Sequence, residues 1–230
     1  FGKKTIEIRY MTAKDEDILT SPTLLRRGLA IERMLQNIII EPGVDTSDLL
    51  IGDKNALLFA ARVTGYGRGY EAEVTCANCG HEHDHVFDLS EYVDHYIFKE
   101  PSESEFELTD NGTFLAELPN TKVKIEMRFM TGEDEDFLQK TAEMRNKKNL
   151  GDSVLTNMLK RLIVSANGVD NQTEIAQFID NMPAQDARYL RAAYSNVAPN
   201  VEFVTAVECP QCGEHTDTEV PITAGFFWPQ

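Results

Sequence analysis

Hydrophobic and polar side chains alternate along two short stretches of the chain, residues 6–10 and 125–129. In both stretches Ile, Met or aromatic residues occupy one face, and Glu and Arg occupy the other. A period of two is typical of a half-buried β-strand. A threonine follows each strand, Thr12 and Thr131, and an aspartate comes three residues later. Threonine is a favoured N-cap residue and acidic residues favour the first helical turn, so each strand is predicted to lead into a helix.

Longer hydrophobic stripes predict further elements. Ser21-Pro22 is typical of a helix start, and the stripe that follows predicts one amphipathic helix. The residues of this stripe are Leu24, Gly28, Ile31, Leu35 and Ile38. Later in the chain, Asp152 is expected to cap a helix that stops near Asn167-Gly168. Further helices are expected near residues 47–51, 54–63, 173–180 and 183–195, and strands near 70–75, 84–89, 202–208 and 216–222.

The order of these elements repeats because the sequence itself repeats. Residues 6–19 and 125–138 are identical at nine of fourteen positions, where chance gives about one identity for typical residue frequencies. Weaker similarity relates Met34–Ile39 to Met158–Ile163 and continues to two Cys-x-x-Cys-Gly motifs. We therefore interpret the chain as two copies of one unit, roughly residues 3–90 and 121–225.

The four cysteines of the chain all lie in these two motifs, Cys76 and Cys79 in the first and Cys209 and Cys212 in the second. Two residues between thiols allow both sulfurs to reach one ion, and the glycine that follows permits the backbone to turn. Each motif supplies only two of the four ligands of a tetrahedral site. If the copies pack about a pseudo-twofold axis, the two motifs complete one Cys₄ site, for which a structural Zn²⁺ is the expected ion.

Two other interpretations of the cysteines remain open. Each copy would hold its own ion if nearby histidines completed the ligands, and four of the five histidines lie close to the motifs: His81, His83, His85 and His215. Alternatively, the pairs would be redox dithiols. Redox Cys-x-x-Cys pairs normally open a helix after a strand, whereas these pairs lie between two predicted strands. The shared Cys₄ site uses every cysteine and requires no asymmetry between the copies.

The predicted fold class is α+β, a tandem duplication of a strand–helices–zinc-knuckle hairpin unit with pseudo-twofold symmetry, joined at one zinc-ribbon-like Cys₄ site. Three regions are expected. Residues 1–90 form the first repeat and residues 121–230 the second, including an aromatic C-terminal tail. Residues 91–120 form an acidic linker with a β-hairpin, because Asp110-Asn111-Gly112 is a strong hairpin signal.

Composition restricts the classes of function. The net charge of −16 repels nucleic-acid phosphates, so no nucleic-acid partner is expected, and an acidic surface suits a basic partner instead. The longest apolar runs are too short to cross a membrane, and the first residues do not have the pattern of a secretory leader, so secretion is not expected.

We find no Ser-His-Asp arrangement, no Walker loop and no coupled carboxylate pair, and a closed Cys₄ site offers no open position for a substrate. Neither catalytic nor cofactor-binding residues are therefore predicted, and the protein is expected not to be an enzyme.

The C-terminal residues Phe226-Phe227-Trp228 are unusual for a chain end, which is normally polar. They either pack onto the core of the protein or serve as an aromatic anchor for a partner, because Trp and Phe are favoured at interfaces.

Several motifs together resemble the baseplate protein family of T4-like contractile-tailed bacteriophages, which includes baseplate hub subunits and hub assembly proteins. These motifs are the stretch Met11–Pro22, the knuckle Cys209-Pro-Gln-Cys212-Gly and the closing Phe226-Phe-Trp-Pro229. The resemblance spans most of the chain. It implies a role in building the tail baseplate hub through contacts with other tail proteins, in the host cytoplasm during assembly and in the virion tail baseplate.

The function hypothesis is therefore a non-enzymatic baseplate hub protein that acts in assembly, as a structural component or as an assembly chaperone. A zinc-ribbon regulator of transcription or replication is the main alternative, and a dithiol oxidoreductase is a third. Retention on DNA at physiological salt would favour the regulator, and freely titrating thiols would favour the oxidoreductase.

Overall fold

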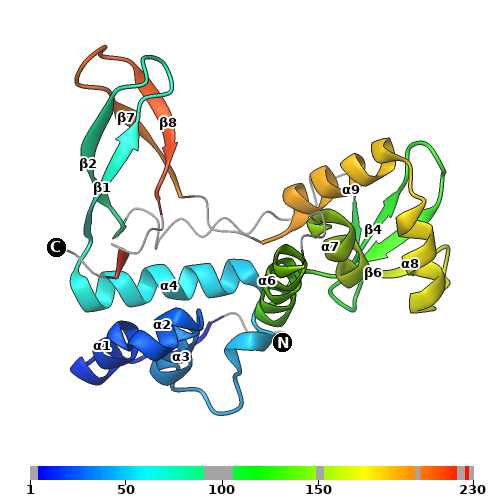
Figure 1. Cartoon of the computed structure of the whole chain (residues 1–230), viewed down its shortest axis with the longest axis horizontal. Coiled ribbons are helices and arrows are strands. Elements are labelled where there is room, and N and C mark those ends of the chain that lie inside the picture. The colour runs from blue at the N-terminus through cyan, green and yellow to red at the C-terminus, as the bar shows by residue number, and fades with distance from the viewer. Residues whose placement is uncertain (1–4, 91–105, 149–152, 200–202, 222–225, 228–230) are drawn as a thin grey trace. The chain divides into compact units, whose positions relative to one another are not determined.

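The computed structural model has a mixed α+β architecture and describes residues 5–90, 106–148, 153–199, 203–221 and 226–227 (Figure 1). The chain divides into two compact units, each described here by itself. Unit 1 comprises Phe1–Thr46, Lys54–Ile97 and Asn200–Gln230. Unit 2 comprises Ser47–Asp53 and Phe98–Pro199. The C-terminal part of the second expected repeat therefore belongs to the same unit as most of the first.

One long helix predicted in unit 1 is two shorter ones in the structure. The helices of this unit are α1 (Ala13–Thr20), α2 (Pro22–Arg26), α3 (Ala30–Ile38) and, from Lys54 on, α4 (Ile51–Tyr66). A single helix from Ser21 to Ile38 was the wrong prediction, because Gly28 has a φ of 68° and breaks it into α2 and α3. This left-handed conformation is accessible to glycine at no steric cost. Leu35 and Ile38 of α3 are fully buried, as the stripe predicts, and so is Met34, which is not part of the stripe.

The first predicted strand is reduced to an isolated bridge between Ile8 and Ile39. The backbone N–H of Arg9 donates to the Ile38 carbonyl at 2.9 Å, and that of Ile40 donates to the Glu7 carbonyl at 3.0 Å. The segment therefore lies extended beside the end of α3, although it forms no regular strand within the described residues.

A glycine-rich run, residues 65–69, begins in the last two residues of α4 and ends the helix. Gly67 has a φ of 83°. The guanidinium of Arg62, only 1% exposed, donates to the Gly67 carbonyl at 2.7 Å and to the Gly69 carbonyl at 3.0 Å. These two hydrogen bonds fix the path of the chain from α4 into β1 (Gly69–Thr75), the strand that leads to Cys76.

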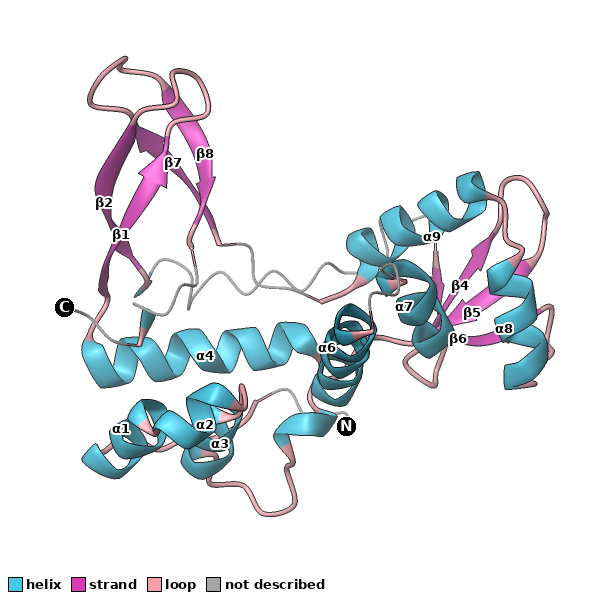
Figure 2. Ribbon diagram, in the orientation of Figure 1, coloured by secondary structure: helices cyan, strands magenta, loops and turns pink. Residues whose placement is uncertain are grey.

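Unit 2 contains a four-stranded antiparallel sheet with the order β3-β4-β5-β6, of which Figure 2 labels β4, β5 and β6. Its strands are β3 (Glu107–Leu108), β4 (Phe114–Glu117), β5 (Lys124–Met127) and β6 (Ile163–Ala166). A turn with Gly112 at a φ of 73° joins β3 to β4. The helices are α6 (Gly132–Lys147), α7 (Val154–Leu162), α8 (Gln172–Asp180) and α9 (Ala184–Val197).

The core of unit 2 lies between one face of this sheet and helices α7, α8 and α9. Phe114, Ile125 and Met127 on the sheet are fully buried, as are Leu162 on α7 and Leu190 on α9. The predicted stop of this helix near Asn167-Gly168 was wrong, because α7 ends at Leu162 and the chain continues directly as β6. Asp152, the expected cap, lies outside the described residues.

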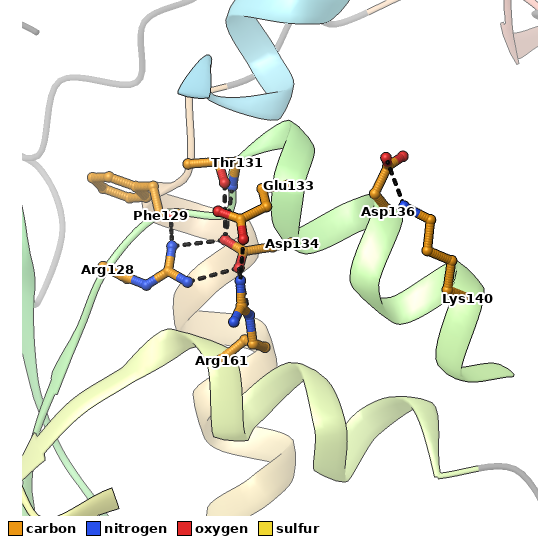
Figure 3. Close-up of polar contacts among 8 residues, drawn as sticks. All are labelled: Arg128, Phe129, Thr131, Glu133, Asp134, Asp136, Lys140 and Arg161. Atoms are coloured by element: carbon orange, nitrogen blue, oxygen red, sulfur yellow. Dashed lines mark hydrogen bonds and ion pairs between the residues drawn. The ribbon is translucent and has the colours of Figure 1, made fainter. Parts of the chain in front are cut away.

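A buried aspartate joins strand to helix at the start of α6 (Figure 3). Asp134 is fully buried and accepts hydrogen bonds from both Nη atoms of Arg128 at 2.7 Å and from Nε of Arg161 at 2.7 Å. It also accepts from the backbone N–H of Thr131 at 3.0 Å, as an N-terminal capping carboxylate does. Burial raises the pKa of Asp134, but the hydrogen bonds from Arg128 and Thr131 outweigh it and lower the pKa to about 2.

The same arrangement occurs at the start of α1. Asp15 is fully buried and accepts from Arg9 Nη1 at 2.7 Å, from the Thr12 backbone N–H at 2.8 Å and from Asn37 Nδ2 at 2.6 Å. Hydrogen bonding by Arg9 is the largest effect that lowers the pKa of Asp15 below its usual range. The N-caps Thr12 and Thr131 were predicted from the sequence; the arginines that neutralise the two aspartates were not.

We expect Asp134→Asn to lower the free energy of unfolding by about 2–3 kcal/mol, because Arg128 and Arg161 lose a buried, hydrogen-bonded counterion. A carboxyl with a lowered folded pKa stabilises the protein above its unfolded pKa of about 3.9 and stops doing so as the pH falls towards the folded value. The difference between wild type and variant should therefore shrink between pH 4 and pH 2. Urea unfolding at a series of pH values measures both quantities.

Asp136→Asn is the matched control. Asp136 lies on the same helix and pairs with Lys140 at 3.4 Å in an exposed i, i+4 contact (Figure 3). Such pairs contribute about 0.3–0.5 kcal/mol. Equal losses for the two variants would contradict the structural role of Asp134.

Candidate metal centre

Two β-hairpins of unit 1 carry the cysteines in their loops. The first hairpin pairs β1 with β2 (Glu82–Asp88), and the second pairs β7 (Val204–Glu208) with β8 (His215–Glu219). Figure 1 shows the loops of the two hairpins at the same end of the unit. The predicted strands before and after each cysteine pair match these four strands to within a few residues.

The loop of the first hairpin is held by hydrogen bonds to the backbone of Cys76. Its N–H donates to the His81 carbonyl at 2.9 Å, and its carbonyl accepts from Gly80 N–H at 2.9 Å. Gly80 has a φ of 74°, a conformation in which a larger residue would be strained. The chain thus reverses direction tightly after Cys79 and leaves both sulfurs on the same side.

The loop of the second hairpin has the same hydrogen bonds. Cys209 N–H donates to the Glu214 carbonyl at 2.9 Å, and the Cys209 carbonyl accepts from Gly213 N–H at 2.9 Å. Gly213 has a φ of 69°. The glycine after each second cysteine therefore has the turning role that the sequence indicates.

All four Sγ atoms lie within 4.8 Å of one another. Sγ of Cys76 lies 3.8 Å from Sγ of Cys212, and Sγ of Cys79 lies 3.7 Å from Sγ of Cys209. Each of these short distances joins one hairpin to the other. A tetrahedral ion with metal–sulfur bonds of about 2.3 Å separates its sulfurs by about 3.8 Å. The cluster thus has the dimensions of a possible tetrahedral thiolate site.

The four cysteines differ in their exposure to solvent. Cys76 and Cys209 are buried, whereas Cys79 and Cys212 face solvent. The backbone N–H of Glu214 is the largest of the effects that lower the pKa of the Cys212 thiol to about 7, and Asn78 Nδ2 approaches its sulfur at 3.7 Å. At Cys79 the backbone hydrogen bond from His81 lowers the pKa, but burial and the three neighbouring thiols outweigh it and raise the pKa to about 12.

The imidazoles do not join the four sulfurs. Among the described residues, the cysteines form the only group of at least three His, Cys, Asp or Glu side chains whose ligand atoms converge in this way. His81 stacks on His83 with ring centroids 5.7 Å apart, and His85 meets the ring of Phe87 edge to face at 4.7 Å. His83 and His85 instead lie on one face of β2, next to His81 just before the strand, and His215 begins β8.

An aromatic cluster in unit 1 lies below the hairpins and includes the described part of the C-terminal tail. Phe226 is fully buried and contacts Phe59 of α4 at 5.0 Å and Tyr70 of β1 at 5.2 Å between ring centroids. Phe59 also stacks on Phe203 at 3.6 Å. The Tyr70 hydroxyl donates to the Pro221 carbonyl at 2.8 Å, which joins the first hairpin to the end of the second. Phe226 and Phe227 are thus core residues, while Trp228 lies outside the described residues.

Comparison with known proteins identifies the family. The model of a family described as T4 bacteriophage base plate protein matches residues 1–228, nearly the whole chain. The chain therefore belongs to this family. No curated protein and no solved structure matches it. None of the helices in the described ranges has the length and apolar character of a membrane span.

We expect Phe226→Ala to lower the free energy of unfolding by about 3–5 kcal/mol, the usual cost of removing a fully buried phenyl ring. Thermal unfolding followed by circular dichroism measures the loss. Tyr10→Ala is the control because Tyr10 is 74% exposed, and its removal should cost less than about 0.5 kcal/mol. A Phe226→Ala variant as stable as the control would show that the tail does not belong to the core.

Proposed function

We propose that this chain is a non-enzymatic component of the phage tail baseplate, and that it acts in assembly of the baseplate hub through contacts with other tail proteins. The observation that carries the proposal is the family match over residues 1–228. The proposed setting is the host cytoplasm during assembly, followed by the baseplate of the virion tail. Whether the protein stays there as a structural subunit or leaves as an assembly chaperone is decided by the experiment below.

We further propose that Cys76, Cys79, Cys209 and Cys212 hold one structural Zn²⁺. The spacing of the four sulfurs supports this ion, because Zn²⁺ prefers a tetrahedron of thiolates. Four protein ligands leave no coordination position for a substrate or a water molecule, so the site would serve stability and not catalysis. A metal held between the two loops would fix one hairpin against the other.

Matching contacts support a duplicated architecture. Arg128 N–H donates to the Leu162 carbonyl at 2.9 Å, the same distance as between Arg9 and Ile38. The capping aspartates and the hydrogen bonds of the two cysteine loops also recur. Arg161 contacts Asp134 at the sequence position that corresponds to Asn37, which contacts Asp15. These contacts are what two copies of one folded unit would retain.

The acidic surface of the first hairpin disfavours a zinc-ribbon regulator that binds nucleic acid. The outward-facing residues of β1 and β2 include the exposed carboxylates of Glu71, Glu73, Glu82 and Asp84. Glu73 lies directly opposite Asp84 in the ladder, so like charges are adjacent. Such a surface repels phosphate and suits contacts with basic protein surfaces. The family match gives the regulator no support.

We expect the purified protein to carry about one Zn²⁺ per chain, and Cys209→Ser to lose both the metal and most of its stability. Structural zinc contributes roughly 10 kcal/mol or more to folding at neutral pH. Metal content by mass spectrometry and thermal unfolding with and without a chelator provide the two measurements. A redox dithiol protein would instead show thiols that titrate freely with no metal released.

His81→Ala and His215→Ala are the controls for the ligand set. Both variants should keep one Zn²⁺ per chain, because the four sulfurs are sufficient to bind it. Two ions per wild-type chain, with one ion lost in either histidine variant, would contradict the shared site. Each hairpin would then hold its own ion with two cysteines and histidine.

We expect quantitative mass spectrometry to detect the protein in infected-cell lysate. If it is a structural subunit, it should also be present at fixed stoichiometry in purified virions. Its absence from virions, together with its presence in baseplate intermediates isolated from lysate, would identify an assembly chaperone. Absence from both the virion and every baseplate intermediate would refute the proposed function. Tail tube protein measured in the same samples controls for recovery.

A further inference from the structure

Helix α6 of unit 2 is unusual because most of it is not buried. Of its sixteen residues only Gly132 and Asp134, both in the first turn, are buried. Phe137 is 45% exposed and Met144 is 56% exposed. Large apolar side chains seven residues apart lie on the same face of a helix. This face, together with the C-cap residue Lys148, is called the α6 stripe and consists of Glu133, Phe137, Lys140, Thr141, Met144 and Lys148.

The phenyl ring at the start of the α6 stripe is held in place. The guanidinium of Arg161 on α7 lies over the ring of Phe137, 4.9 Å from its centroid. Asp134 fixes the same guanidinium by a hydrogen bond at 2.7 Å (Figure 3). The ring is therefore covered from one side by a positioned cation, and its exposed surface is presented in a defined orientation.

The charges of the α6 stripe are complementary to those of a second copy of the stripe that runs antiparallel to it. Glu133 stands at the N-terminal end of the stripe and Lys148 at the C-terminal end. If two copies of the helix lie antiparallel, with a twofold axis between Lys140 and Thr141, Phe137 of each meets Met144 of the other. The same axis brings Glu133 of each copy to Lys148 of the other.

We propose that the α6 stripe is a self-association surface, and that α6 pairs antiparallel with α6 of a second copy of this chain. The pairing is isologous, so one patch serves both copies. A parallel pairing would place Glu133 against Glu133 and Lys148 against Lys148, which is unfavourable. Antiparallel helices also oppose their macrodipoles favourably. The macrodipole accounts for acidic residues near the start of a helix and basic residues near its end, but it does not account for the exposed Phe137 and Met144.

The size of the surface sets the strength of the interaction. Stable interfaces bury about 1,200–2,000 Å² in total, and a single pair of four-turn helices buries less than this. The dimer is therefore expected to be weak, with a dissociation constant in the micromolar range or above. Such an interaction becomes effective where other contacts raise the local concentration, because linked binding events reinforce one another.

Sedimentation velocity over a range of protein concentrations, from about 1 µM to about 1 mM, tests this surface directly. The wild-type chain should shift from monomer to dimer as its concentration rises. Met144→Glu and Glu133→Lys should each weaken self-association by at least tenfold. The double variant Glu133→Lys/Lys148→Glu should restore it, because each reversed charge again meets its complement. Val86→Glu is the control: Val86 is 62% exposed on the first hairpin, and this change should leave the dimer unaltered.

Three results would overturn the proposal. The first is a chain that stays monomeric at every concentration, and the second is a dimer that Met144→Glu and Glu133→Lys leave unchanged. The third is a dimer that Glu133→Lys weakens but the double variant does not restore, which would exclude the antiparallel register. Met144 is 56% exposed and can be replaced without disturbing the core. Glu133 is also exposed but pairs with Arg161 at 3.8 Å, so circular dichroism and thermal unfolding of each variant check that the fold is kept. The result is independent of the metal and of the baseplate assignment, so its failure would leave both untouched.

Discussion

Convergence of four sulfurs from two distant loops is the constraint on which unit 1 depends. More than a hundred residues separate Cys79 from Cys209, and closing a loop of that length costs about 4–5 kcal/mol of chain entropy. The aromatic contacts of Phe226 with Phe59 and Tyr70 offset part of this cost. The proposed Zn²⁺ would exceed it, since structural zinc contributes roughly 10 kcal/mol or more. The long segment between the two loops can then form unit 2 without weakening the hairpins.

The buried aspartates supply a second, local constraint that requires no metal. Asp15 and Asp134 each connect the end of an extended segment to the first turn of a helix and neutralise an arginine from that segment. Both contacts span only six residues. They can therefore form before the distant loops meet, which is consistent with the low entropic cost of short loops.

Sequence patterns predicted the parts of this structure that depend on local chemistry. The N-caps Thr12 and Thr131, the long helices α4 and α9 and the strands that flank the cysteines follow from residue type and periodicity. The break at Gly28 was missed, because glycine fits the spacing of a hydrophobic stripe and only its backbone conformation reveals the interruption. The prediction of a regular first strand was also wrong, since Ile8 forms only an isolated bridge with Ile39. Arg9 and Arg128 occupy matching positions of the repeated sequence, each six residues before a capping aspartate. This match could have predicted the two buried ion pairs.

Comparison of α1 with α6 indicates where the two copies of the proposed duplication would differ in role. Ile18 of α1 and Phe137 of α6 occupy corresponding positions in the repeat, yet α1 has eight residues and α6 has sixteen. Both helices keep the capping aspartate, because the strand-to-helix connection requires it. Of the two helices, only α6 exposes large apolar side chains, Phe137 and Met144, to solvent. The shared residues therefore maintain the fold of each half, and the residues that differ, above all those of α6, are where specific recognition is to be sought.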